Sequence, residues 1–216
     1  MFQVPSFKPQ ERGITLVEII LVVFIMSIFF MIVIADFPKI SRQTALSRVA
    51  YKFAQDLRKA EDLGLSGVVI TNDQTPKPVP IETIKGYGIY VDISHQPATN
   101  YIVYADIDNS KTYNPGSVEE CGKLASSSPQ FDCIIEAVDI SQENKSLSIK
   151  SIVDAENEDI LGSSISINFT PPGPLVTIKD DIHILYSNTK IGIVFQNTDK
   201  ATRTVWINTA GLIDVQ

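Results

Sequence analysis

Hydrophobic positions are concentrated in one nearly uninterrupted run close to the start of the chain. Residues 19–35 read IILVVFIMSIFFMIVIA, in which Ser27 is the only polar side chain. Apolar residues from position 14 onward extend this run to about the 20 residues that a helix needs to cross a bilayer. The pattern therefore predicts a membrane-spanning helical segment over residues 14–37.

After Pro38 the pattern becomes amphipathic. Apolar residues recur at the three- and four-residue spacing of one helix face, and charged residues occupy the other faces. The apolar positions are Leu46, Val49, Ala50, Phe53, Leu57 and Ala60. We expect one helix over 14–63, with Gly64 or Gly67 as its stop and Pro38 as a kinked or loosened point. The apolar stripe is expected to pack on the rest of the chain, and a helix lying on a membrane surface is the alternative.

From residue 68 onward, short β-rich segments alternate with turn sequences. Segments rich in β-branched and aromatic residues predict strands at 68–71, 87–93, 101–105, 133–140, 147–153, 165–169, 175–178, 191–195 and 204–208. The alternation in residues 165–169 (ISINF) predicts a strand with one buried and one solvent-exposed face. Many short strands in series predict antiparallel sheets and not a βαβ fold. The expected fold class is α+β, with the long N-terminal helix packed on a β domain over 64–216.

Composition narrows the function classes. The chain has 216 residues, of which 44% are hydrophobic, so it can bury a packed core. Its net charge of −7 argues against nucleic acid as the main ligand, because phosphate binding needs clustered Lys and Arg. Lys200 and Arg203 are two cations near the C-terminus, and Asp199 and Asp214 beside them favour a solvated surface.

Glu18 stands inside the apolar run. A carboxylate in a bilayer costs roughly 2.5–3.5 kcal/mol on insertion scales, so Glu18 is a functional-site candidate that needs a partner. Lys8 and Arg12 precede the run, and such basic flanks stay cytoplasmic, which places the C-terminal bulk of the chain on the other side. A secretory signal peptide would end in a small-residue cleavage site, whereas Asp-Phe-Pro follows Ala35. The sequence therefore disfavours a secretory signal peptide.

The sequence Arg12-Gly13-Ile14-Thr15-Leu16-Val17-Glu18, followed by the apolar run, resembles the processing signal of type IV prepilins and type II secretion pseudopilins. The resemblance implies that a prepilin peptidase removes residues 1–13 as a leader, cutting between Gly13 and Ile14, and methylates the amine of Ile14. The family's first mature residue is usually Phe or Met, and Ile14 departs from this. The resemblance also implies that Glu18 pairs with the N-terminal amine of a neighbouring subunit, because two opposite charges can enter an apolar core together.

The remainder is similar in outline to H-type minor pseudopilins and FimT-type minor pilins. The similarity lies in residues 57–63, 86–90, 104–108, 167–173 and 206–213, whereas residues 113–163 are expected to be an insertion. It implies a non-enzymatic subunit of a type IV pilus or type II secretion filament, whose partners are other subunits and an inner-membrane assembly platform. The subunit would wait in the inner membrane as a single-pass protein and then enter an extracellular or periplasmic filament. The alternative is a membrane-anchored extracellular module that binds a ligand, a surface or DNA.

Residues 106–110 (DIDNS) place oxygen-bearing side chains at the first, third and fifth positions of a calcium-loop pattern. Lys111 stands where that loop has Gly, and the twelfth position lacks its Glu, although Glu119 and Glu120 follow. Two interpretations remain. Asp106 and Asp108 hold calcium, the only cofactor that the sequence indicates, or they form a solvated turn.

Cys121 and Cys133 are the two cysteines of the chain. An extracytoplasmic compartment is oxidising and favours a disulfide between them, which would contribute roughly 2–4 kcal/mol, and two reduced thiols are the alternative. The sequence predicts no catalytic site. His95 and His183 occur in unrelated contexts, and neither a GxxxxGK[ST] phosphate loop nor an HExxH zinc motif is present.

Overall fold

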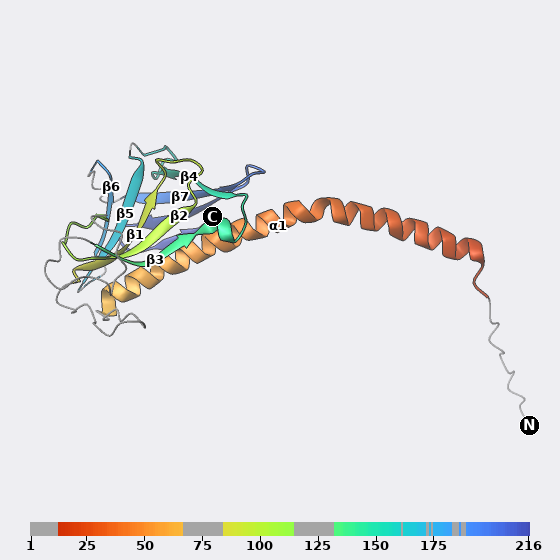
Figure 1. The fold of residues 1–216 in the computed structure, drawn as a ribbon, viewed down its shortest axis with the longest axis horizontal. Coiled ribbons are helices and arrows are strands. Elements are labelled where there is room, and N and C mark those ends of the chain that lie inside the picture. Colours follow the sequence, from red (N-terminus) through yellow and green to blue (C-terminus); the bar gives the residue numbers. More distant parts are fainter. Residues whose placement is uncertain are drawn as a thin grey trace, which may run out of the picture. The chain divides into compact units, whose positions relative to one another are not determined.

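The computed structural model describes residues 13–66, 84–114, 132–160, 162–171, 173, 175–182, 186 and 189–216, except the side chain of Ala35. The chain divides into two compact units, Met1–Ser41 and Arg42–Gln216, here called the N-terminal and C-terminal units. Helix α1 (Leu16–Ser66) has residues in both units (Figure 1).

Helix α1 begins directly after a capping residue. The Thr15 hydroxyl accepts a hydrogen bond from the Glu18 amide (3.3 Å), and the Thr15 carbonyl oxygen accepts bonds from the Glu18 and Ile19 amides (3.1 and 3.3 Å). Thr15 therefore serves as the N-cap, a position that favours Ser, Thr, Asp and Asn. The helix ends at Ser66, three residues beyond the predicted end, and Pro38 lies inside it without terminating it.

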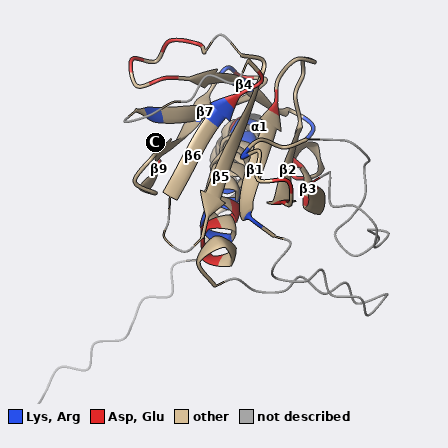
Figure 2. Cartoon of the chain, turned by 90° about the vertical axis from the view of Figure 1, so that its left-hand side faces the viewer, with Lys and Arg blue, Asp and Glu red and all other residues tan. Residues whose placement is uncertain are grey.

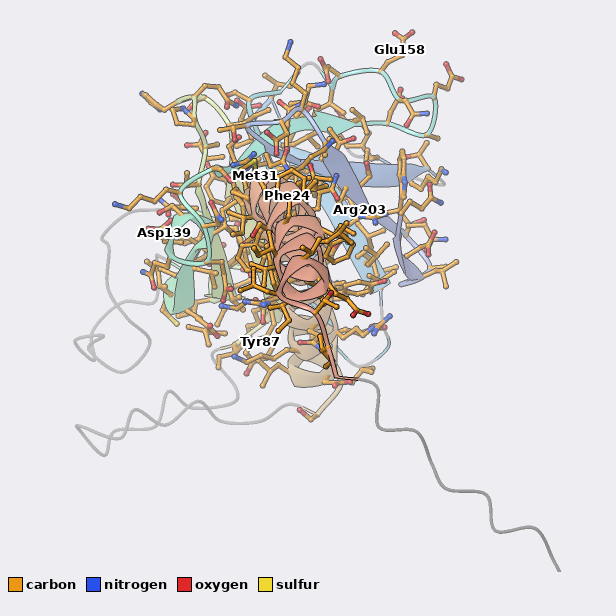
Figure 3. All side chains as sticks on the ribbon, turned by 90° about the vertical axis from the view of Figure 1, so that its right-hand side faces the viewer. Phe24, Met31, Tyr87, Asp139, Glu158 and Arg203 are labelled. Atoms are coloured by element: carbon orange, nitrogen blue, oxygen red, sulfur yellow. The ribbon has the colours of Figure 1, made fainter. Side chains whose placement is uncertain are left out.

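The N-terminal unit presents an apolar helical surface. Between residues 14 and 34 the large hydrophobic side chains are 48–73% exposed, and Figure 3 shows Phe24 and Met31 pointing away from the helix. Among the described residues, α1 is the one helix long and apolar enough to cross a membrane, with a window of mean hydropathy 3.1. The N-terminal unit therefore offers a surface for other molecules and not a core of its own.

The C-terminal unit contains two antiparallel sheets. In the first sheet the strand order is β3-β2-β1-β5-β6, formed by β1 (Gly86–Asp92), β2 (Asn100–Asp106), β3 (Cys133–Asp139), β5 (Ser164–Thr170) and β6 (Leu175–Asp180). In the second sheet the order is β4-β7-β8-β9, formed by β4 (Leu147–Val153), β7 (Lys190–Asn197), β8 (Thr202–Asn208) and β9 (Ile213–Val215). A short 3-10 helix, η2 (Ile140–Gln142), follows β3. The α+β class with a long N-terminal helix on antiparallel sheets is confirmed.

The amphipathic part of α1 packs against both sheets. Its predicted apolar stripe is buried, with exposures of 0–2% at Leu46, Val49, Ala50, Phe53, Leu57 and Ala60. The Phe53 ring meets Tyr101 of β2 edge-on at 5.0 Å between centroids and Phe195 of β7 at 5.3 Å. One helical side chain thus joins the two sheets, because Tyr101 and Phe195 belong to different ones.

The observed strands lie close to the predicted positions, with two additions from the structure. Strand β9 was not predicted, because three residues carry too little pattern. Within the predicted insertion at 113–163, β3 pairs with β2 and β4 pairs with β7, so its described part belongs to both sheets. The strand predicted at 68–71 lies outside the described residues.

Strand β5 contradicts the prediction of one solvent-exposed face. Its polar residues Ser164, Ser166 and Asn168 are only 5%, 3% and 0% exposed. The cause is the segment 107–114, which lies on this face, and its Tyr113 amide donates a hydrogen bond to Ser166 Oγ (2.9 Å). Both faces of β5 are therefore covered, one by apolar core and the other by a polar layer.

Candidate functional site

The predicted cleavage junction precedes the first helical turn. Gly13 and Ile14 are exposed and non-helical, and no atom lies within 4 Å of the position of an added Gly13 Cβ. A peptidase needs an accessible bond that can be drawn into extended form. The local backbone at this junction meets that requirement.

Glu18 occupies the first turn of α1 and is exposed. The spacing of Thr15 and Glu18 is that of a capping box, and an acid near a helix N-terminus contributes about 0.3–1 kcal/mol. Among the described residues no basic side chain forms an ion pair with Glu18. Within one chain, Glu18 therefore helps to start the helix and keeps its carboxylate available.

Three carboxylates meet where β2 ends and β3 begins. Asp106, Asp108 and Asp132 each offer one oxygen, and these oxygens all lie within 4.8 Å of one another; we call them the carboxylate cluster. Asp106 and Asp132 are buried, whereas Asp108 is exposed. The antiparallel pairing of Ala105 with Cys133 brings the chain back to this point. The sequence pattern indicated Asp106 and Asp108 but not Asp132, whose one signal is its position directly before a predicted strand.

The buried carboxylates organise the segment 107–114. Asp106 accepts hydrogen bonds from the amides of Asn109 (2.7 Å) and Lys111 (3.0 Å). Asp132 accepts them from the amides of Ile107 (3.0 Å) and Asn114 (2.8 Å). Each carboxylate thereby holds one stretch of backbone against the sheet.

The carboxylate cluster is electrostatically strained. Burial raises the pKa of Asp132 to about 7 and also raises the pKa of Asp106, against the opposing effect of their backbone donors. For Asp108 the burial effect is outweighed by hydrogen bonds, chiefly from Ser110, and its pKa is lowered. A shared proton or a bound cation would relieve the repulsion between these groups.

The donor set of the cluster consists of oxygens alone, which fits calcium. Asp106 Oδ1 and both Asp132 oxygens accept one N–H each and keep a second lone pair for a cation, whereas Asp106 Oδ2 accepts from both Lys111 and Asn168. Calcium takes about six to eight oxygen ligands, and the cluster supplies three side chains toward that number. Glu119 and Glu120 lie outside the described residues, so calcium binding stays a prediction.

Cys133 is buried next to the cluster and is disulfide-bonded. Cys121, the other cysteine of the chain, lies outside the described residues. Cys133 packs in a small apolar group with Ile84, Tyr87, Ala105 and Ile107. The covalent link is thus attached to the same strand start that carries Asp132.

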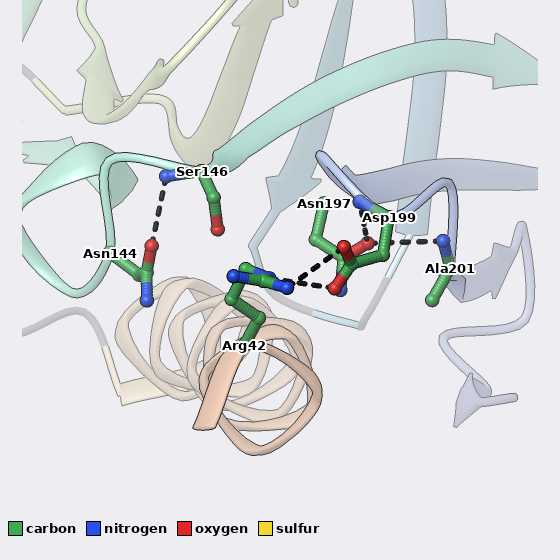
Figure 4. A network of polar contacts seen from close by, with 6 residues as sticks. All are labelled: Arg42, Asn144, Ser146, Asn197, Asp199 and Ala201. Carbon is green, nitrogen blue, oxygen red and sulfur yellow. Dashed lines mark hydrogen bonds and ion pairs between the residues drawn. The ribbon is translucent and has the colours of Figure 1, made fainter. Parts of the chain in front are cut away.

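Charged pairs link α1 to the sheets within the C-terminal unit. The Arg42 guanidinium donates two hydrogen bonds to the Asp199 carboxylate, at 2.7 and 3.0 Å (Figure 4). Two further pairs join Arg48 to Glu143 (3.1 Å) and Lys59 to Glu136 (2.8 Å), and Figure 2 shows acidic and basic residues side by side on the helix. Such exposed pairs contribute about 0–1 kcal/mol each, so they orient the helix more than they stabilise it.

The remaining candidates from the sequence do not converge on one site among the described residues. His95 is exposed, with Nδ1 at 2.8 Å from Ser94 Oγ, and His183 lies outside the described residues. Lys200 and Arg203 are exposed near the β7–β8 turn, which also contains Asp199. Asp199 is already paired with Arg42, so it does not offset the positive charges of Lys200 and Arg203.

The fold and these sites define a class of protein: a helix with a free apolar surface that continues into a two-sheet α+β unit. No family model matches the chain, and no curated protein or solved structure matches it at a significant level. Any functional assignment therefore rests on the chain's own residues.

Proposed function

We propose that the chain is a filament subunit of the type IV pilin and type II secretion pseudopilin class. One observation carries the proposal, which is that the Gly13–Ile14 junction directly precedes a helix with Glu18 in its first turn and an unburied apolar surface. The α+β class, with the same helix continuing into a β domain, supports it.

The apolar surface of the N-terminal unit needs a covering molecule. Contiguous exposed apolar surface of this extent marks a membrane or protein contact. In the proposed cycle, lipid covers residues 14–37 before assembly and the helices of other subunits cover them afterwards. Because lipid tails are as apolar as these side chains, close packing between helices and polar contacts drive the exchange.

Glu18 would set the register between subunits. After cleavage at Gly13, the new amine of Ile14 carries a positive charge at the start of the helix. A Glu18 carboxylate that meets the amine of a neighbouring subunit gains an opposite charge in apolar surroundings, which offsets its desolvation. A misplaced neighbour would leave both charges unpaired, so the pair selects one axial position.

The proposal is tested by N-terminal sequencing and intact mass measurement of the protein purified from its native membrane. A chain that begins at N-methylated Ile14 is the expected result. A chain that retains Met1 contradicts the proposal and favours the membrane-anchored binding module. A Gly13→Val variant, which obstructs the cleavage position, is expected to retain the leader and serves as the reference for the unprocessed mass.

A further inference from the structure

Two neighbouring hollows lie over the first sheet and share Tyr90. The larger has a volume of about 430 Å³ and is lined by residues that include Tyr90, Tyr113, Ser110, Asn114, Ser164 and Asp181. The smaller has a volume of about 320 Å³ and is lined by residues that include Tyr90, Asp92, His95, Pro97, Thr99 and Asn100. Both volumes fall in the range of small-molecule sites, about 300–1,000 Å³.

The position of Tyr90 follows from strand alternation. Ile89 and Val91 of β1 belong to the core beneath α1, so Tyr90 between them lies on the opposite face of the sheet. Tyr90 is half-buried, and its ring lies 5.0 Å from that of Tyr113. The Tyr113 ring in turn lies 5.3 Å from that of Tyr104.

The rings of Tyr90, Tyr113 and Tyr104 form a row, and contacts with the sheet and with the segment 107–114 hold this row in place. A Cβ at Gly88 would come within 2.8 Å of the Tyr104 ring, so the absence of a side chain there lets this ring lie on the sheet. The Tyr113 amide is bonded to Ser166 (2.9 Å), which fixes the segment that carries this ring. Tyr90 thus stands between the two hollows as a supported aromatic surface.

The groups around Tyr90 are neutral or acidic. The larger hollow carries the hydroxyls of Ser110, Thr112 and Ser164, and the smaller one carries the side chains of Thr99 and Asn100. Neither hollow has a lysine or arginine among its described lining residues. This chemistry disfavours phosphate, sulfate and other anionic ligands.

Three carboxylates line the hollows, those of Asp92, Asp180 and Asp181, and each already accepts a hydrogen bond within the chain; Asp180 accepts one from the Tyr186 hydroxyl (3.0 Å). Asp92 accepts a hydrogen bond from the Ser94 amide (2.8 Å), and Asp181 accepts one from the Ser163 hydroxyl (2.6 Å). Their remaining lone pairs can accept hydrogen bonds from a ligand. Since neutral donors and acceptors outnumber these carboxylates, the lining matches a polyhydroxylated ligand better than a cationic one.

We propose that the two hollows form a binding groove for a neutral oligosaccharide, with Tyr90 as the aromatic platform between two sugar subsites. The C–H face of a sugar ring packs on a tyrosine ring, while its hydroxyls exchange hydrogen bonds with the surrounding hydroxyl, amide and carboxylate groups. The groove lies in the C-terminal unit and involves neither Glu18 nor the cleavage junction. It is therefore independent of the proposed filament function.

The experiment uses the full chain in an amine-oxide detergent, because maltoside headgroups would compete for the groove. Saturation-transfer NMR and titration are carried out with neutral hexasaccharides of β-1,4-glucose, β-1,4-N-acetylglucosamine and α-1,4-glucose, and with tetralysine. We expect saturation transfer to the ring protons of at least one hexasaccharide. Tyr90→Ala is expected to weaken that binding roughly tenfold, as loss of an aromatic anchor does, and Tyr90→Phe to retain most of it.

Tyr51→Ala is the matched control, because Tyr51 is 59% exposed on α1 and lines neither hollow. Asn100→Trp is a second variant at an exposed position of the smaller hollow and is expected to block binding without affecting the core. If Tyr90→Ala does not fold, Asn100→Trp still tests whether the oligosaccharide binds in this groove. Failure of every hexasaccharide to bind, binding of tetralysine alone, or unchanged binding by Asn100→Trp would each overturn the proposal.

Discussion

Glu18 has a local role at the start of α1, and the proposed function gives it a second, intermolecular one; substitution can separate the two. Its position three residues after Thr15 favours the start of α1, and its carboxylate is free of ion pairs among the described residues. A change at Thr15 affects only the cap. A change at Glu18 removes the charge as well.

We expect Glu18→Ala to abolish incorporation into filaments, because the neighbouring amine would be left unpaired in apolar surroundings. The measurement is the fraction of subunit recovered in sheared filaments, with thermal unfolding as the test of the C-terminal unit. Thr15→Ala is the control, and it is expected to lower helix stability by about 1 kcal/mol while incorporation persists. Normal incorporation of Glu18→Ala would refute the register role.

Asp56 is a carboxylate that α1 carries into the core. It is 8% exposed and accepts a hydrogen bond from the Tyr101 hydroxyl (2.5 Å). Burial raises its pKa, and the Tyr101 bond opposes this in part. A raised pKa means that the folded state holds the proton more tightly than the unfolded state. The stabilising contribution of Asp56 is therefore complete below its unfolded pKa and is lost as pH rises through its folded pKa.

Asp56→Asn keeps an acceptor for Tyr101 and removes the titration. We expect the free energy of unfolding of the wild type to fall, relative to this variant, as pH rises above about 4, the ordinary pKa of Asp. Denaturant unfolding of the wild type and of Asp56→Asn, at pH values above about 4, measures the difference between their free energies of unfolding. Asp106 and Asp132 titrate in both proteins, so their effect cancels in this difference. A difference that does not change with pH would contradict the assignment.

The calcium interpretation of the carboxylate cluster makes its own prediction. A cation held by Asp106, Asp108 and Asp132 binds the folded state alone, so calcium should raise the melting temperature and EGTA should lower it. Asp108→Asn removes the exposed ligand without disturbing the buried hydrogen bonds and is expected to abolish the difference. Identical melting curves with calcium and with EGTA would favour the solvated turn.

At the scale of elements, the two parts of α1 differ in the exposure of their apolar side chains. Its first part exposes large apolar side chains, as Phe24 shows at 65% exposure. Its second part buries a narrow stripe between two sheets, with Phe53 at 0% exposure. A phenylalanine is therefore exposed in the first part, at Phe24, and belongs to the folded core in the second, at Phe53.

Phe53→Ala is expected to lower the free energy of unfolding of the C-terminal unit by about 3–5 kcal/mol, because it opens a cavity between Tyr101 and Phe195. Phe24→Ala is the matched control and is expected to leave that free energy unchanged. Denaturant unfolding followed by the fluorescence of Trp206, which lies in β8, reports on the correct unit. Equal effects of the two substitutions would contradict this division of α1.

At the scale of the whole molecule, the average composition conceals two environments. Cleavage after Gly13 would remove Lys8, Glu11 and Arg12, and the net charge would change from −7 to −8. The hydrophobic fraction of 44% combines the exposed apolar side chains of the N-terminal unit with the buried core of the C-terminal unit. Neither of the two hollows over the first sheet has a lysine or arginine among its described lining residues.

The sequence by itself determined the features that depend on neighbours along the chain. The apolar run and the spacing from Leu46 to Ala60 are local patterns, and both were found where the pattern placed them, whereas the cap at Thr15 came from the structure. Most strands were also predicted, because β-branched residues and turn residues act over a few positions. Asp106 and Asp108 belong to the same category, since they are two residues apart.

Only the tertiary structure decided which distant segments meet. Asp132 joins Asp106 because β2 and β3 pair antiparallel, and Tyr90 separates two hollows because the segment 107–114 folds back over the sheet. The polar side of β5 is buried for the same reason, although its alternation predicted a solvent-exposed face. A sequence pattern records the polarity of each residue, whereas burial depends on what long-range pairing brings above it.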